Sequence, residues 1–294
     1  MPELPEVETV RRGLEPVLVG NVIAHVEQRR ADLRFPLPDR FDEQLTGRAV
    51  EALDRRAKYL LARLDDGKVL VMHLGMTGRF AIDKADGTHN TPGRFAHEPS
   101  QIPKHEHIVF HLGDGAAIRY SDVRRFGIMD LVPASMLDRH ALFRGLGVEP
   151  LGDDLSTAWL AAKLKGKTTT TKATLLDQRL IAGLGNIYVC EALHEARISP
   201  TKRAGLLATK TGKPTEKTDA LVKSIKAVLR SAIKAGGSSL RDYRHTDGRL
   251  GRFQHFFKTY GRTGEPCTQE GCDGTIQRIV QSGRSTFFCP VCQK

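Results

Sequence analysis

The stretch that decides the fold is residues 59–74, which read YLLARLDDGKVLVMHL. Two short apolar runs flank the turn signal Asp-Asp-Gly at 65–67, and further runs of this kind lie at 22–26 and 107–112. This spacing predicts that the first 130 or so residues form a β-sandwich with an N-terminal helix packed against it. The polar segment 84–104 is predicted to be a long surface loop or an insertion.

The C-terminal half of the chain has a helical pattern. Apolar residues recur at helical spacing over 221–233, which predicts a helix that has Thr218 or Asp219 as its N-cap and stops at the glycine pair 236–237. A second helix is predicted over 187–196. The fold class expected from these patterns is therefore α+β.

The charge balance points to a polyanionic partner. The chain has 294 residues, with 45 Lys and Arg against 34 Asp and Glu, a net charge of +11. Such a charge favours nucleic acid through phosphate contacts, although ribosome-associated proteins and other basic enzymes share it. No run reaches the ~18 apolar residues of a membrane span, and the acidic start lacks the layout of a signal peptide. We expect a cytoplasmic protein with no membrane partner.

Four of the five cysteines crowd together near the C-terminus. They form the pairs Cys-x4-Cys and Cys-x2-Cys, at Cys267, Cys272, Cys289 and Cys292. This pattern suits one tetrahedral structural Zn²⁺ better than two disulfides or unrelated thiols. The zinc would fold a hairpin that has almost no core of its own, and that hairpin would present the turn at 281–286. No organic cofactor is expected, and Cys190 is predicted to be a buried helical residue.

The chain begins MPELPEVETVRRGL at residues 1–14. If the initiator methionine is removed, Pro2 becomes a terminal secondary amine directly beside the carboxylate of Glu3. An ordinary α-amino group has a pKa of about 7.7–8.0, so on the order of a tenth of it is neutral and nucleophilic at pH 7. Its attack on an aldehyde-level carbon would form an iminium that withdraws electrons. The alternative is that Pro5 simply opens an amphipathic helix.

This N-terminal run resembles the start of the formamidopyrimidine-DNA glycosylases, bacterial enzymes that excise oxidised purines from DNA. Further motifs resemble family motifs in the family order and span essentially the whole chain. They are RRAKYL at 55–60, HLGM at 73–76, RRFG at 124–127, GLGNIY at 183–188 and the terminal cysteines. Two departures stand out: four residues lie inside the first cysteine pair where two are expected, and Val123 replaces an expected proline.

The resemblance implies a particular domain organisation. It comprises an N-terminal catalytic β-sandwich domain, a linker, a helical helix–two-turn–helix DNA-binding domain and a zinc finger. Their expected limits are 1–133, 134–151, 152–258 and 259–294.

The resemblance also implies a bifunctional reaction, in which a glycosylase step is followed by cleavage of the abasic site through β- and δ-elimination. The Pro2 nitrogen would attack C1′ of a nucleotide flipped out of the duplex. Glu3 would donate and shuttle protons, a role that suits a partly desolvated carboxyl group. Lys58 would assist elimination, and Arg284 would stabilise the leaving phosphate.

The flipped nucleotide leaves a gap in the base stack that must be filled. Met76 and Phe126 match the family's apolar wedge, and Arg124 matches the residue that meets the orphaned base, expected to be cytosine. Ordinary core packing is the alternative for Met76 and Phe126. Segment 236–253 occupies the place of the loop that closes over the flipped base. The resemblance implies that five residues contact the sugar–phosphate backbone of the DNA: His105, Arg124, Lys167, Lys172 and Asn186.

The expected substrate is therefore duplex DNA that contains 8-oxoguanine or a formamidopyrimidine, preferably opposite cytosine. A monomer associated with the nucleoid is expected. Three alternatives stay open: an endonuclease VIII-like glycosylase for oxidised pyrimidines, a non-catalytic zinc-ribbon DNA-binding protein, and a basic RNA-binding or ribosome-associated protein.

Overall fold

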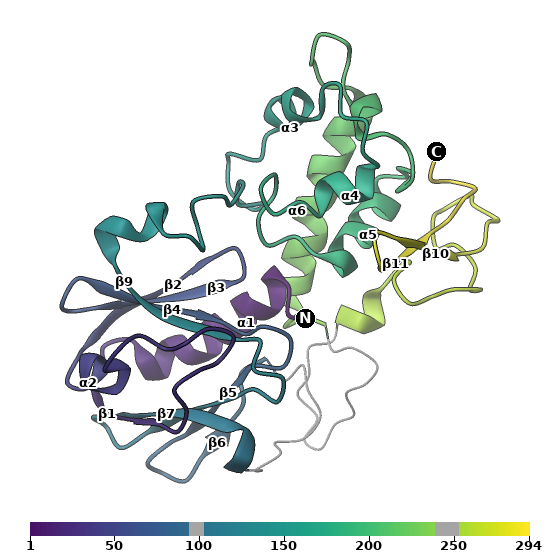
Figure 1. Cartoon of the computed structure of the whole chain (residues 1–294). Coiled ribbons are helices and arrows are strands. Elements are labelled where there is room, and N and C mark those ends of the chain that lie inside the picture. The colour runs from purple at the N-terminus through teal and green to yellow at the C-terminus, as the bar shows by residue number, and fades with distance from the viewer. Residues whose placement is uncertain (94–102, 239–252) are drawn as a thin grey trace. The chain divides into compact units, whose positions relative to one another are not determined.

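The computed structural model describes residues 1–93, 103–238 and 253–294 (Figure 1). The chain divides into two compact units. Unit 1 comprises Met1–Arg144 and the segment that begins at Ala235, and unit 2 comprises Gly145–Lys234 and Phe253–Lys294. These two units do not test the four domain limits expected from the sequence, which therefore stay predictions.

Unit 1 contains two antiparallel sheets and a long N-terminal helix, α1 (Leu4–Leu18). The five-stranded sheet has the order β1-β7-β8-β5-β6, and the four-stranded sheet has the order β2-β3-β4-β9. The strands are β1 (Ile23–Gln28), β2 (Val50–Arg56), β3 (Tyr59–Leu64), β4 (Lys68–His73), β5 (Arg79–Asp83), β6 (His89–Asn90), β7 (Glu106–Leu112), β8 (Ala117–Ser121) and β9 (Ile128–Pro133). The short helices are α2 (Phe41–Leu45), η1 (Pro103–His105) and η2 (Ala134–Arg139).

The core of unit 1 lies between the two sheets and includes the apolar face of α1. Val10 and Leu14 of the helix are buried together with Leu60 of one sheet and Phe110 of the other. The expected β-sandwich with a packed N-terminal helix is confirmed. The prediction of a loop over 84–104 is wrong where β6 pairs with β5, and residues 94–102 lie outside the described part of the chain.

Unit 2 contains four α-helices and a β-hairpin among its described residues (Figure 1). Its elements are α3 (Thr157–Leu164), α4 (Thr171–Leu175), α5 (Asn186–Glu195), η3 (Ala204–Leu207), α6 (Glu216–Lys234), η4 (Phe253–Phe256), β10 (Gln277–Gln281) and β11 (Arg284–Phe288). Together with unit 1, these elements confirm the α+β class. No helix in the described ranges combines the length and the apolar character needed to cross a bilayer.

The start of α6 differs from the prediction. The helix begins at Glu216, so neither Thr218 nor Asp219 is its N-cap. Thr215 and Thr218 exchange hydrogen bonds instead: each backbone N–H donates to the other side-chain oxygen, at 3.1 and 3.3 Å. This reciprocal pair satisfies backbone groups that a helix start leaves open, and it adds most of a turn to the helix.

Candidate active site and zinc centre

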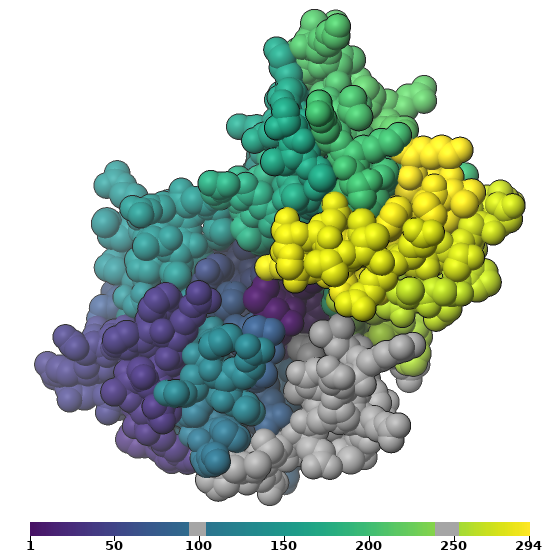
Figure 2. Space-filling view, turned by 45° about the vertical axis from the view of Figure 1, so that its right-hand side comes forward, coloured from purple at the N-terminus to yellow at the C-terminus, as the bar shows by residue number. Residues whose placement is uncertain are grey.

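The N-terminal end of the chain is held by a capping box at the start of α1. The Glu3 side chain accepts a hydrogen bond from the backbone N–H of Glu6, and Glu6 Oε2 accepts one from the backbone N–H of Glu3 at 2.9 Å. Both glutamates are buried, whereas Pro2 is half-buried and Met1 is exposed. In the space-filling view the darkest purple atoms, at the N-terminal end, are visible at the surface (Figure 2). The capping box therefore fixes the carboxyl group of Glu3 beside an accessible chain terminus.

Both anionic and cationic side chains affect the pKa of the terminal amine. Burial lowers the pKa of the Met1 amine below its ordinary value of 8.0, and the carboxylates of Glu3 and Glu6 oppose this shift. The cations Lys58 and Arg124 lower this pKa further. Because the net shift is downward, more of the amine is neutral and nucleophilic at neutral pH than in an exposed terminus.

Lys58 is buried on the turn between β2 and β3. Arg55 stabilises this turn, since its Nη1 donates to Ala57 O at 2.9 Å and its Nε donates to Glu8 Oε2 on α1 at 3.1 Å. Burial raises the pKa of Glu8, but hydrogen bonds from neighbouring arginines outweigh that effect and hold the pKa below its ordinary value. The ionised Glu8 therefore anchors the turn that carries Lys58 to the helix that begins beside Glu3.

The three side chains predicted to fill the stack lie on two adjacent turns. Met76 and Phe126 are 37% and 41% exposed, so neither belongs to the core. The Arg124 guanidinium carbon lies 4.6 Å from the centroid of the Phe126 ring. Gly75 has φ +60°, and a Cβ there would lie 2.4 Å from the carbonyl carbon of Phe126. Only glycine allows the two turns to approach so closely.

His105 is placed beside the second of these turns. It is the last residue of η1 and is half-buried. Its backbone carbonyl accepts a hydrogen bond from the N–H of Asp122 at 3.0 Å. Within unit 1, the structure therefore brings the predicted residues into two groups: one around the terminal amine and one on the turns that carry Met76 and Phe126.

Arg284 lies in unit 2, at the start of β11. The hairpin turn before it consists of Ser282 and Gly283, with φ of 49° and 73°. Two successive positive φ angles are typical of the tight hairpin turns that match the strand twist. Arg284 is exposed at the end of this turn. The predicted presentation of an arginine by the hairpin agrees with this geometry.

Lys172 and Asn186 converge on the residue that follows Arg284. Lys172 Nζ donates to Ser285 O at 2.9 Å and to Thr286 Oγ1 at 2.7 Å, and Asn186 Nδ2 donates to Ser285 O at 3.0 Å. A direct contact with a DNA phosphate would require the ammonium group of Lys172 to lie at the surface. Lys172 is only 1% exposed, so this requirement is not met. It supports the hairpin from inside. Lys167, by contrast, is exposed.

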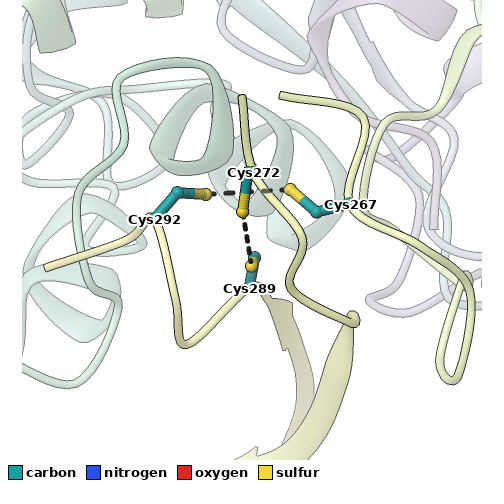
Figure 3. Close-up of side chains that lie close together, drawn as sticks. All are labelled: Cys267, Cys272, Cys289 and Cys292. Carbon is teal, nitrogen blue, oxygen red and sulfur yellow. Dashed lines mark hydrogen bonds between the residues drawn. The ribbon is translucent and has the colours of Figure 1, made fainter. Parts of the chain in front are cut away.

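The four terminal cysteines form a compact cluster (Figure 3). Their sulfur atoms all lie within 4.8 Å of one another, with 3.7 Å between one pair and 3.6 Å between the other. Zn–S bonds of about 2.3 Å in a tetrahedron place sulfurs about 3.8 Å apart, so the cluster fits zinc. All four are free thiols, which excludes the disulfide alternative. The expectation of one structural Zn²⁺ is confirmed, and Cys267, Cys272, Cys289 and Cys292 are the residues that would hold it.

The longer first knuckle still closes on the metal site. The N–H of Cys272 donates to Gln269 O at 3.1 Å, and Gly271 takes φ 72° to complete the turn. The apolar core beside it consists of Ile276 and Phe287 with one of the cysteines. Because this core is so small, zinc binding contributes a large part of the free energy that folds the segment.

Two contacting residues were not singled out in the sequence. His194 Nε2 on α5 lies 3.3 Å from Cys267 Sγ, and no motif marks it. Glu6 Oε1 accepts hydrogen bonds from the N–H and Oγ of Ser238 at 2.8 and 2.9 Å. The Glu3-x-x-Glu6 spacing is that of a capping box and could have indicated its role. Most of the predicted closing loop, residues 239–252, lies outside the described part of the chain.

Three family models match consecutive parts of the chain. They are the formamidopyrimidine-DNA glycosylase N-terminal domain over residues 1–129, the formamidopyrimidine-DNA glycosylase H2TH domain over 146–244, and a zinc finger found in FPG and IleRS over 264–294. Each match carries motifs noted in the sequence, from the N-terminal run to the four cysteines.

Relatives and solved structures agree with these matches. The chain is 60% identical to the formamidopyrimidine-DNA glycosylase of Beijerinckia indica and 58% identical to that of Methylocella silvestris, over the full length of both proteins in each pair. It resembles the structure of Lactococcus lactis Fpg in complex with an abasic site containing DNA, with 36% identity, a TM-score of 0.82 and full coverage of both chains. A mutant of the same Lactococcus enzyme, in complex with a Fapy-dG containing DNA, is 37% identical with a TM-score of 0.81 and the same coverage. The chain therefore belongs to the formamidopyrimidine-DNA glycosylase family of DNA repair enzymes.

Proposed function

We propose that this enzyme removes 8-oxoguanine and formamidopyrimidines from duplex DNA and then cleaves the abasic site by β,δ-elimination. The observation that carries the proposal is the placement of half-buried Pro2 directly beside the buried carboxyl group of Glu3, in a region where the cations Lys58 and Arg124 act on the amine of the preceding Met1. The Lactococcus lactis relatives that were crystallised with abasic and Fapy-dG DNA support this substrate class.

The nucleophile is the nitrogen of Pro2, set free when Met1 is removed. It bonds to C1′ of the extruded nucleotide and gives up its N–H proton, while the bond from C1′ to the damaged base breaks and the departing base takes up a proton. Opening of the sugar ring then gives an iminium between Pro2 and C1′, with a proton taken up by the ring oxygen. The iminium acidifies the C2′ hydrogen. Loss of that proton expels the 3′ phosphate, and a second elimination expels the 5′ phosphate.

Side chains around the terminus take the other roles. Glu3 is the proton donor and shuttle, because its carboxyl group is buried directly beside the nucleophile. Lys58 assists elimination, since it is the cation carried to this region by an anchored turn. Arg284 stabilises the leaving phosphate, because its guanidinium fork can hold two phosphate oxygens. The zinc, when bound, holds the hairpin that presents Arg284 and takes no part in the bond changes.

The DNA partner is recognised by exposed and half-buried groups. Met76 and Phe126 enter the stack, while Arg124 donates to the orphaned base. A guanidinium group only donates hydrogen bonds, so it suits the N3 and O2 acceptors on the pairing edge of cytosine. His105 and Lys167 contact the backbone, as does Asn186 at the start of α5. The enzyme acts as a monomer on nucleoid DNA.

The experiment that tests this function is borohydride trapping on a duplex with 8-oxoguanine opposite cytosine. Protein whose Met1 is confirmed absent by mass spectrometry should form a covalent adduct. Pro2→Gly should form the adduct more slowly under the same conditions, because its primary terminal amine gives an imine that can lose its N–H proton, whereas the proline iminium carries a fixed charge. Glu3→Gln should lose base release while it still traps on a preformed abasic site. Wild-type protein that binds the duplex and gives no adduct would refute the lyase and favour a non-catalytic DNA-binding protein.

A further inference from the structure

Asp122 is a fully buried carboxylate at the junction of three segments of unit 1. It follows β8 and begins the turn that carries Arg124 and Phe126. Its backbone N–H donates to His105 O at 3.0 Å, and its backbone carbonyl accepts from His107 Nε2 at 2.8 Å. The main chain of Asp122 is therefore bonded to the segment that contains His105.

The carboxylate of Asp122 accepts hydrogen bonds from two turns at once. Gly127 N–H donates to Oδ2 at 2.7 Å and the Tyr120 hydroxyl donates to Oδ2 at 3.3 Å, while the Thr77 hydroxyl donates to Oδ1. Thr77 Oγ1 also accepts from the N–H of Arg124 at 3.0 Å. One hydroxyl group thus links the residue after Met76 to the backbone of Arg124.

The space around this cluster leaves little freedom for either turn. A Cβ at Gly127 would lie 1.8 Å from the Tyr120 hydroxyl oxygen, and one at Gly78 would lie 2.4 Å from it. Burial and the neighbouring Asp122 raise the pKa of Tyr120 well above its ordinary value, so the hydroxyl stays protonated and remains a donor. The buried charge is thus met by donors from both turns, as a buried carboxylate requires.

We propose that Asp122 is a positioning residue that, through Thr77, sets the two turns so that Met76, Arg124 and Phe126 are ready to enter the stack before DNA binds. The inference rests on the proposed function. All three side chains are exposed, so the backbone beneath them has a large part in their placement. A displacement of about 1 Å in a positioned group can cost about 10²-fold in rate, which is why a rigid support matters here.

Thr77 offers a matched pair of variants that tests the idea. Thr77→Val keeps the shape but removes the hydroxyl that joins the turns, whereas Thr77→Ser keeps that hydroxyl. Each protein is given two substrates: an 8-oxoguanine duplex under single-turnover conditions, and a single-stranded abasic oligonucleotide. The single strand has no stack to enter, so its cleavage needs the terminal amine but not the wedge.

Thr77→Val should slow excision from the duplex by about tenfold or more and leave cleavage of the single strand within about twofold of wild type. Thr77→Ser should behave as wild type on both substrates. Asp122→Asn should show the same selective loss, and Asp130→Asn, a half-buried carboxylate on β9, should show none. Unchanged duplex excision by Thr77→Val, or an equal loss on both substrates, would overturn the proposal. Failure of the proposed function is distinguishable, because wild-type protein would then cleave neither substrate.

Discussion

Replacement of Lys172 by methionine separates a structural role from a DNA contact. Lys172 Nζ makes two hydrogen bonds to the hairpin, to Ser285 O and Thr286 Oγ1. Hydrogen bonds from a charged donor stabilise a fold by about 1.5–3 kcal/mol each, but burial of the ammonium offsets part of this gain. We therefore expect Lys172→Met to lower the free energy of unfolding by about 2–3 kcal/mol, measured by urea denaturation of the zinc-loaded protein.

The same variant should leave the salt dependence of DNA binding unchanged. Each lost phosphate contact reduces the slope of log K against log salt by about 0.9 for duplex DNA. We expect that reduction for Lys167→Met, whose lysine is exposed, and no loss of stability. For Lys172→Met we expect an unchanged salt slope and a lower free energy of unfolding. A smaller salt slope with an unchanged urea midpoint in Lys172→Met would refute the reasoning and restore the direct phosphate contact that the family resemblance implies.

Three further predictions follow from other parts of the structure. Cys289→Ser, or chelation of the zinc, should unfold the hairpin and weaken DNA binding, seen as loss of protease resistance after Arg262 and a higher Kd; an intact hairpin without metal would contradict this. Burial and the nearby cations Lys58 and Arg34 lower the pKa of His73 to about 4 in the folded protein. Between pH 6.5 and pH 4 the unfolded chain therefore binds a proton at this histidine that the folded protein does not bind. The free energy of unfolding should fall by up to about 3 kcal/mol as the pH drops through this range. His73→Gln should lessen that fall in a pH series of thermal melts, and an unchanged slope would count against it. Glu6→Ala should reduce stability by about 1–3 kcal/mol in urea, because the N–H groups of Glu3 and Ser238 lose their acceptor, and an unaltered midpoint would exclude this role.

The local sequence pattern was sufficient to predict a structural element where one short stretch of residues determines that element. The run at 59–64 coincides with β3, because its apolar residues and the following Asp-Asp-Gly turn require no distant partner to be recognised. The cysteine pairs indicated the zinc site for the same reason, since spacing alone limits the geometry of the ligands. The burial of Cys190 in α5 was also predictable, because a lone cysteine in a helix behaves as a small apolar residue.

Pattern was insufficient where a residue's role depends on a distant partner. Lys172 ends a basic run that looks like a solvated surface, yet its acceptors lie on β11, more than 100 residues later in the chain. Asp122 belongs to no motif, and the hydroxyl of Thr77 that it binds comes from another turn. The early start of α6 depends on two threonines, Thr215 and Thr218, that exchange hydrogen bonds. The residue types alone do not distinguish this pair from a single threonine that acts as the N-cap.

The identity of the atom that bonds to the sugar is the most direct test of the reaction. The reduced protein–DNA adduct can be digested with nuclease and trypsin and sequenced by tandem mass spectrometry. We predict that the remnant of the deoxyribose is attached to the nitrogen of Pro2 in the N-terminal peptide. A remnant on the ε-amino group of Lys58 or of any other lysine, with an unmodified N-terminal peptide, would contradict the account.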